Sequence, residues 1–234
     1  MSNINVLKRD GTIEDLNLEK VHKMVEFAVE GLAGVSASQV EIQSGLQFCD
    51  GIRSADIQEI LIRSASDLIS EEHPNYQYVA ARLLLFGLRK AVHGHPEILP
   101  PLLEHVKGCI DKGVYDGTIV NRYSEEEWDR IDSFVDHERD YLFTYAGLRQ
   151  VVDKYLVQDR SSGEHYESPQ QMYIMISATL FANYPKETRL DYVRRYYNAI
   201  STHKINIPTP IMGGVRTPIR QFASCVLVDI DDTL

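Results

Sequence analysis

Apolar residues recur every three to four positions over most of the chain, the spacing that predicts amphipathic helices with one buried face. The first helix is predicted to start after Asn17, a good N-cap residue, and to run through Leu32. Its buried stripe is predicted to consist of Val21, Val25, Ala28 and Leu32. Further helices are predicted from residues suited to a helix start: from Ser36 to about Phe48, from Ser54 to about Ile69, and from Pro74 to about Val92, where Gly94 and Pro96 end the pattern.

A different pattern precedes these helices. The stretch "NVLKRDGTIED", residues 5–15, holds two short extended segments around Asp10 and Gly11. The glycine supplies the positive φ that a tight hairpin turn needs. The hairpin and the four helices are therefore predicted to form one module, residues 1–93.

The middle stretch, about His93 to His203, is predicted to be helical, with Ser124 and Glu127 spaced for a capping box. Two segments, "DYLFTYAGLRQVVDKYL" and "QQMYIMISATLFA", are apolar on more than one face and read as core helices. The segment "VQDRSSGEHYES" predicts a hairpin around Ser162 and Gly163. The many tyrosines favour core and rim positions over a base-stacking platform, because the chain is acidic.

The last stretch has another composition. Its prolines and paired glycines, Pro208, Pro210, Pro218, Gly213 and Gly214, predict short extended segments rather than helix. The run "CVLVDI", residues 225–230, predicts a strand that carries Cys225, and taken alone this residue would be a buried strand cysteine.

Composition narrows the function classes. The 234 residues are 44% hydrophobic and 25% charged, with a net charge of -10 and a pI near 5.3, which argues against non-specific binding to nucleic acid or anionic membrane. Neither a signal peptide nor an 18-residue apolar run is present, so a cytoplasmic location is expected. The three cysteines lack disulfide or zinc-ligand spacing, and Cys49 and Cys109 are predicted to be inert residues within helices.

Several cations of the first module suggest a local phosphate site. Lys8 and Arg9 precede the hairpin turn, Lys20 lies in the first turn of a helix, and Arg89 and Lys90 lie near the end of another. A lysine at a helix N-terminus opposes the helix dipole unless an anion binds there. The alternative is an ordinary solvated charged face, and charge pattern by itself favours that alternative.

The run "VLKRDGTIEDLNLEKVHKMVEFAVEGL", followed by "DIQEILIRSASDLIS" and "YQYVAARLLLFGLRK", resembles the ATP-cone module, which binds ATP or dATP. The resemblance implies that the nucleotide is held by residues at the matching positions, with Arg9 as a further phosphate contact: Lys8, Glu14, Asn17, Lys20, Ser54, Gln58, Phe86 and Lys90. Gln58 stands where the family has histidine, so a contact near the base or ribose is expected to differ.

The stretch "PTPIMGGVRTPIRQFASC" closely resembles the aerobic class I ribonucleotide reductase large subunit, where the chain enters a ten-stranded α/β barrel. The resemblance implies that Cys225 is one half of the redox pair that reduces the ribose, and that Thr209 and Ser224 contact the substrate. The terminal Asp232, Thr233 and Leu234 match the start of the specificity-effector site.

The expected fold class is therefore mainly α: a hairpin-capped four-helix cone (1–93), a helical domain (94–203) and the first barrel strands (204–234). The chain is expected to be an N-terminal piece of the large subunit, split or truncated, and inactive alone. Implied ligands are ATP or dATP with Mg²⁺, and the radical cofactor resides on the small subunit. Implied partners are a complementary C-terminal fragment, the small subunit, further copies of the large subunit, and thioredoxin or glutaredoxin.

Two alternatives remain at this point. A stand-alone ATP-cone regulator of transcription would need a zinc ribbon or a basic DNA-binding face, and the sequence has neither. A helical scaffold without any ligand would fail to bind adenine nucleotides.

Overall fold

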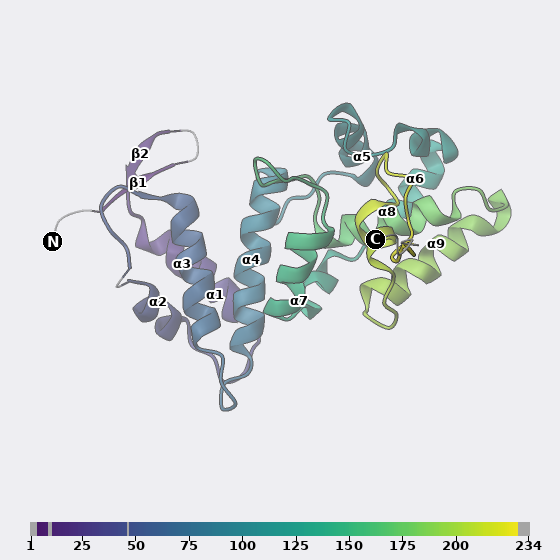
Figure 1. The fold of residues 1–234 in the computed structure, drawn as a ribbon. Helices are drawn as coiled ribbons and strands as arrows, with labels where there is room; N and C mark the ends of the chain where they lie inside the picture. Colours follow the sequence, from purple (N-terminus) through teal and green to yellow (C-terminus); the bar gives the residue numbers. More distant parts are fainter. Residues whose placement is uncertain (1–3, 9–10, 46, 229–234) are drawn as a thin grey trace, which may run out of the picture. The chain divides into compact units, whose positions relative to one another are not determined.

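The computed structural model describes residues 4–8, 11–45 and 47–228. Its contacts divide the chain into two compact units, Met1–Leu99 with Asp140–Val152, and Pro100–Arg139 with Asp153–Leu234. Both units are built mainly of helices, so the mainly α fold class is confirmed (Figure 1). The three domain ranges predicted from the sequence stay a prediction. In the part of the chain described, no helix is long and apolar enough to cross a membrane.

The first unit begins with the predicted hairpin. Strand β1 (Asn5–Leu7) pairs antiparallel with β2 (Ile13–Asp15), and Gly11 in the turn has φ 85°. A short third strand, β3 (Ile52–Arg53), pairs parallel with β1 and was not predicted. This strand ties the hairpin to the start of the third helix, because α3 follows β3 directly.

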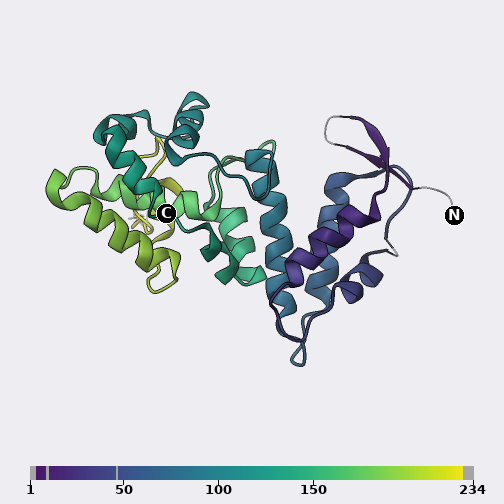
Figure 2. The same ribbon diagram turned by 180° about the vertical axis from the view of Figure 1, so that it is seen from behind.

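Four helices follow in the module predicted for residues 1–93: α1 (Leu18–Val29), α2 (Ala37–Gly45), α3 (Ser54–Asp67) and α4 (Tyr76–His93). Helix α1 packs against α2 and α4, and α3 packs against both α2 and α4 (Figures 1 and 2). The predicted stripe is buried at Val21, Val25 and Ala28, whereas Leu32 lies beyond the end of α1 and is half-buried. Gly94, with φ 75°, ends α4 as predicted.

A segment from later in the sequence completes the first unit. Helix α7 (Tyr145–Gln150) packs against α4, and it continues into the π-helical turn η3 (Val151–Tyr155). The 3₁₀ turn η2 (His137–Leu142) precedes it and carries Asp140. Asp140 and Arg89 of α4 form a buried ion pair with 2.8 Å between Oδ2 and Nη2. The segment 140–152 is therefore joined to α4 by packing and by a buried pair of charges.

The second unit contains the remaining elements: α5 (Leu102–Asp111), η1 (Gly117–Arg122), α6 (Glu125–Asp132), β4 (Gln158–Asp159), β5 (Glu164–His165), α8 (Pro169–Phe181), α9 (Lys186–Ser201) and α10 (Thr209–Gly214). The capping box of Ser124 and Glu127 is confirmed. So is the hairpin around Gly163, where β4 and β5 pair antiparallel. Helix α8 forms the core, since nearly all its residues are buried, and it packs along α9.

A buried network of charges joins the segments around α10. Arg216 donates to Glu167 through Nε and Nη2, to the Met212 carbonyl at 2.6 Å and to the Tyr155 carbonyl at 3.0 Å. Glu167 also accepts from the Tyr115 hydroxyl. Burial opposes the charged form of Arg216, but the adjacent Glu167 carboxylate outweighs it and raises the pKa of the guanidinium. For Tyr115 burial acts in the opposite direction and, together with the adjacent Glu167 carboxylate, raises the pKa of the phenol well above its usual value.

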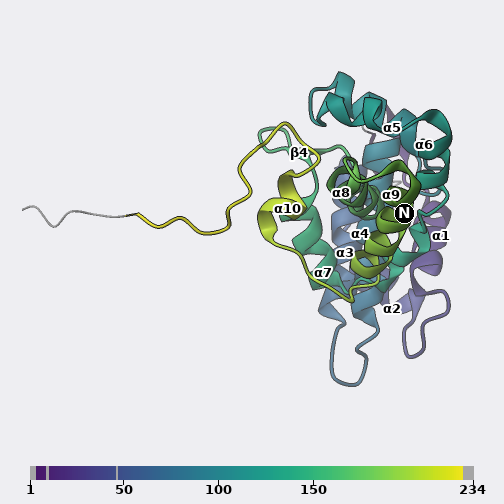
Figure 3. The same ribbon diagram turned by 90° about the vertical axis from the view of Figure 1, so that its right-hand side faces the viewer.

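The prediction of short extended segments in the last stretch is wrong at residues 209–214, which form α10. Pro208 is the N-cap residue and Pro210 lies in the first turn, where a missing N–H costs no helical hydrogen bond. The predicted strand over 225–230 is not observed at 225–228, and its last two residues lie outside the described range. Cys225 is exposed rather than buried, in the segment that extends away from α10 (Figure 3).

Residues 225–228 form no strand because no second strand lies beside them in the described part of the chain. A strand needs a second row of backbone groups to bond with. The described part of the chain places no such row beside residues 225–228, and Leu227 is fully exposed.

The other two cysteines differ in how they compare with the prediction. Cys49 was predicted to lie within a helix, but it lies in an exposed loop after α2. Cys109 is buried in α5 as predicted, and burial raises the pKa of its thiol to about 12.

Candidate functional site

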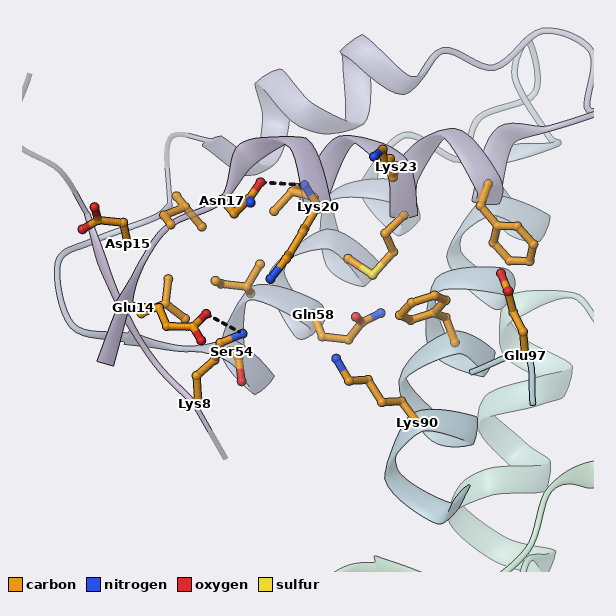
Figure 4. A pocket seen from close by; sticks show the side chains of 17 residues that line it. Lys8, Glu14, Asp15, Asn17, Lys20, Lys23, Ser54, Gln58, Lys90 and Glu97 are labelled. Atoms are coloured by element: carbon orange, nitrogen blue, oxygen red, sulfur yellow. Dashed lines mark hydrogen bonds and ion pairs between the residues drawn. The ribbon is translucent and has the colours of Figure 1, made fainter. Parts of the chain in front are cut away.

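A pocket in the first unit gathers the residues predicted to hold a nucleotide. It is a cavity of about 400 Å³, within the range of small-molecule sites. Its lining includes each of the cone residues named from the sequence that the structure describes: Lys8, Glu14, Asn17, Lys20, Ser54, Gln58, Phe86 and Lys90 (Figure 4). Arg9 lies outside the described residues. Residues separated by up to 82 positions in the sequence (8 to 90) thus meet in one place.

The hairpin supplies one side of this pocket. Lys8 directly follows β1, and Glu14 lies on β2. Their side chains form an ion pair with 3.2 Å between Nζ and Oε2, and both remain partly exposed to solvent. Lys8 is therefore placed at the pocket with its ammonium accessible to an anion.

Helix α1 supplies a second side. Asn17 caps the helix, and its side-chain oxygen accepts a hydrogen bond from the backbone N–H of Lys20 at 3.0 Å. The Lys20 side chain points into the pocket (Figure 4). Its charge lies in the first turn of the helix, where the backbone N–H groups already favour an anion. The local field at this end of α1 is thus suited to a negatively charged group.

The lining also contains apolar residues that sequence reasoning missed: Val6, Leu16, Val21, Met24, Phe27 and Ile57. The rings of Phe27 and Phe86 lie 6.4 Å apart, centroid to centroid. Helical spacing was the signal that could have found part of this set, since Met24 and Phe27 lie four and seven residues after Lys20. Lys23, Asp15 and Glu97 line the pocket too.

Gln58 lies in the pocket wall with its amide nitrogen already engaged. Its Nε2 donates to the Leu83 carbonyl of α4 at 2.6 Å. A Cβ on Gly87 would lie 3.1 Å from Gln58 Cγ, so the glycine makes room for this side chain between α3 and α4. Gln58 therefore connects α3 and α4. The hydrogen bond to α4 fixes the position of the side-chain amide that a ligand in the pocket would contact.

The residues predicted for a substrate site lie in the second unit. Thr209 is the first residue of α10, and its hydroxyl is 3.5 Å from that of Tyr155. Ser224 Oγ is 3.9 Å from Cys225 Sγ, and both residues are exposed. Among residues 4–228 that are described, no hydrogen bond joins Thr209 to Ser224 or Cys225. Asp232, Thr233 and Leu234 lie outside the described residues.

Two family models match the chain. The model of the ATP cone domain matches residues 4–91, and that of the ribonucleotide reductase all-alpha domain matches residues 141–220. The pocket described above lies mostly within the first of these ranges.

Curated relatives match nearly the whole chain. It is 55% identical over 229 residues to the ribonucleoside-diphosphate reductase subunit alpha of Haemophilus influenzae, covering 98% of the chain and 30% of the relative. It is 53% identical over 232 residues to the ribonucleoside-diphosphate reductase 1 subunit alpha of Escherichia coli, covering 99% and 30%. The subunit alpha of Enterobacteria phage T4 is 42% identical over 236 residues, covering 100% and 31%. The chain thus spans about 30% of the length of the relatives that it matches.

Proposed function

Because the chain belongs to the family of ribonucleoside-diphosphate reductase α subunits, we propose that it provides their regulatory adenine-nucleotide site and part of their catalytic machinery. The main support for the nucleotide site is the pocket, where predicted residues from the hairpin, α1, α3 and α4 line one cavity. The ligands are ATP and dATP. The alternative of a stand-alone cone regulator is disfavoured, because similarity continues beyond the cone through the all-alpha domain.

The residues that line the pocket match the two chemical parts of a nucleotide, its charged phosphates and its aromatic base. Lys8 and Lys20 provide ammonium groups for a polyphosphate, as lysines do at other phosphate sites, and Lys90 adds a cation beside Gln58 (Figure 4). The aromatic and apolar residues, among them Phe27 and Phe86, provide a surface for a purine ring. Mg²⁺ would accompany the nucleotide through its phosphate oxygens, since this ion is usually held by substrate phosphates and water.

The second half of the proposal concerns ribonucleotide reduction. Cys225 supplies one thiol of a redox pair that becomes a disulfide as the ribose is reduced, and Thr209 and Ser224 contact the substrate. A single thiol cannot complete that reaction, so the second cysteine and the rest of the barrel come from the remainder of the α subunit. The partners are that remainder, the small radical-bearing subunit, other α subunits, and thioredoxin or glutaredoxin. Asp232 to Leu234 contribute to the specificity-effector site, and the location is cytoplasmic.

Replacing Lys20 or Lys8 by alanine tests the nucleotide site. Each change removes a charged hydrogen-bond donor from the phosphate end, so we expect ATP binding to weaken by about 1.5–3 kcal/mol. Isothermal titration of the chain with ATP measures this. Arg63→Ala is the matched control, because Arg63 is an exposed cation of α3 that pairs with Glu59 outside the pocket lining. Equal ATP affinity in both lysine variants and the wild type would contradict the assignment.

Replacing Gly87 by alanine tests the role of Gln58. The added Cβ would press on Gln58 Cγ, so the amide must move or lose its bond to Leu83, and we expect ATP affinity to fall about two- to fivefold. Gly108→Ala in α5 is the control, since a Cβ there meets nothing within 4 Å. Unchanged ATP affinity in Gly87→Ala, measured by the same titration, would show that the Gln58 position is irrelevant to the ligand.

A further inference from the structure

One aromatic side chain from outside the cone range supports the wall of the nucleotide pocket. The ring of Tyr141 meets that of Phe27 edge to face, with centroids 6.0 Å apart and planes at 68°. Phe27 in turn contacts Phe86, and both phenylalanines line the pocket, whereas Tyr141 does not. We propose that Tyr141 is a positioning residue of the nucleotide site: it holds the Phe27 ring in place for the base of the ligand.

Tyr141 contacts two cations of α4. The guanidinium carbons of Arg82 and Arg89 lie 5.4 and 5.8 Å from the centre of its ring, and both arginines belong to α4. The residue before it, Asp140, forms the buried ion pair with Arg89. Cations over an aromatic face attract its negative quadrupole, and a buried charged pair is costly to separate. These contacts fix Tyr141 against α4 before any ligand binds.

One turn of α4 contacts both the segment that carries Tyr141 and the nucleotide pocket. Arg89 is buried and pairs with Asp140, while the next residue, Lys90, lines the pocket. A movement of Tyr141 would therefore disturb the aromatic end of the site through Phe27. The polyphosphate end, formed by Lys8 and Lys20 on the hairpin and α1, has no contact with Tyr141 among the interactions of the described residues.

The inference assigns part of the site to a segment that the cone model does not reach. That model ends at residue 91, and Tyr141 lies 50 positions later, in the segment 140–152 of the first unit. The ligand class is the one proposed above, an adenine nucleotide, so the inference rests on that proposed function. It adds that recognition of the base depends on residue 141, and recognition of the phosphates does not.

The test compares two ligands on variants of the complete chain. Tyr141→Leu removes the ring, and loss of one edge-to-face pair is expected to lower ATP affinity about 3- to 10-fold. Affinity for inorganic tripolyphosphate, which has no base, is expected to stay within about twofold of wild type. Tyr141→Phe keeps the ring and is expected to restore ATP affinity to within about twofold of wild type. Both ligands are measured by isothermal titration.

Tyr145→Leu is the matched control, because Tyr145 begins α7 in the same segment and makes no ring contact with another described residue. Equal losses for ATP and tripolyphosphate in Tyr141→Leu would show a general structural role and overturn the inference. So would a Tyr141→Phe variant as weak as Tyr141→Leu, or unchanged ATP affinity in Tyr141→Leu while the wild type binds. Absence of ATP binding by the wild type would instead overturn the proposed function, and the inference with it.

Discussion

Replacing Arg216 by methionine is expected to destabilise the second unit by about 3–5 kcal/mol, because it leaves the Glu167 carboxylate buried without its cation. The change also removes the donors that bond the carbonyls of Met212 at the end of α10 and of Tyr155. Urea denaturation followed by tryptophan fluorescence measures the loss. Trp128 is the single tryptophan of the chain, and it is buried in the second unit.

The double variant Arg216→Met with Glu167→Leu provides the control for this prediction. Removing both charges leaves no unpaired ion, so much of the lost stability should return. ATP affinity should remain at the wild-type value in both variants, since the pocket belongs to the first unit. A destabilisation below about 1 kcal/mol in Arg216→Met would mean that the buried pair contributes little to holding α10.

Replacing Cys225 by serine is expected to abolish multiple turnovers of ribonucleotide reduction when the chain is assembled with the rest of the α subunit and the small subunit. A serine hydroxyl cannot form the disulfide that we propose carries the two electrons of each cycle. The measurement is deoxyribonucleotide formed per active site in the presence of a reducing system. Cys225 is exposed, so its thiol is accessible to a cysteine of another segment.

Cys49→Ser serves as the control for this second prediction, because Cys49 is also exposed but lies in the first unit. ATP binding by the Cys225→Ser chain should be unaffected. Multiple turnovers by Cys225→Ser, or full activity of the remaining polypeptides without this chain, would show that the role given to Cys225 is wrong.

Elements set by local signals were predictable from the sequence. The hairpin follows from Asp10 and Gly11, the start of α1 from the Asn17 cap, and the start of α6 from Ser124 and Glu127. Each of these signals acts within a few residues of the element that it defines. The placement of charges indicated Lys8, Lys20 and Lys90 as candidates, and the resemblance named all eight described residues that the structure places in one pocket.

Features that depend on distant contacts were not predictable. Strand β3 is two residues long and exists because β1 lies beside it. Helix α10 forms despite its prolines and glycines, with Arg216 bonded to its Met212 carbonyl. Tyr141 reaches Phe27 because the segment 140–152 packs on α4, which no pattern within the segment indicates. In each case tertiary packing overrides local propensity.

Binding of an adenine nucleotide in the pocket of the first unit can be observed residue by residue by ¹H–¹⁵N NMR of the chain during titration with ATP. We expect the backbone amide signals of Lys20, Ser54, Gln58 and Lys90 to shift together and saturate, while those of Cys109 and Arg216 in the second unit do not move. Shifts that cluster away from the pocket, or no saturable shifts at millimolar ATP, would contradict the claim.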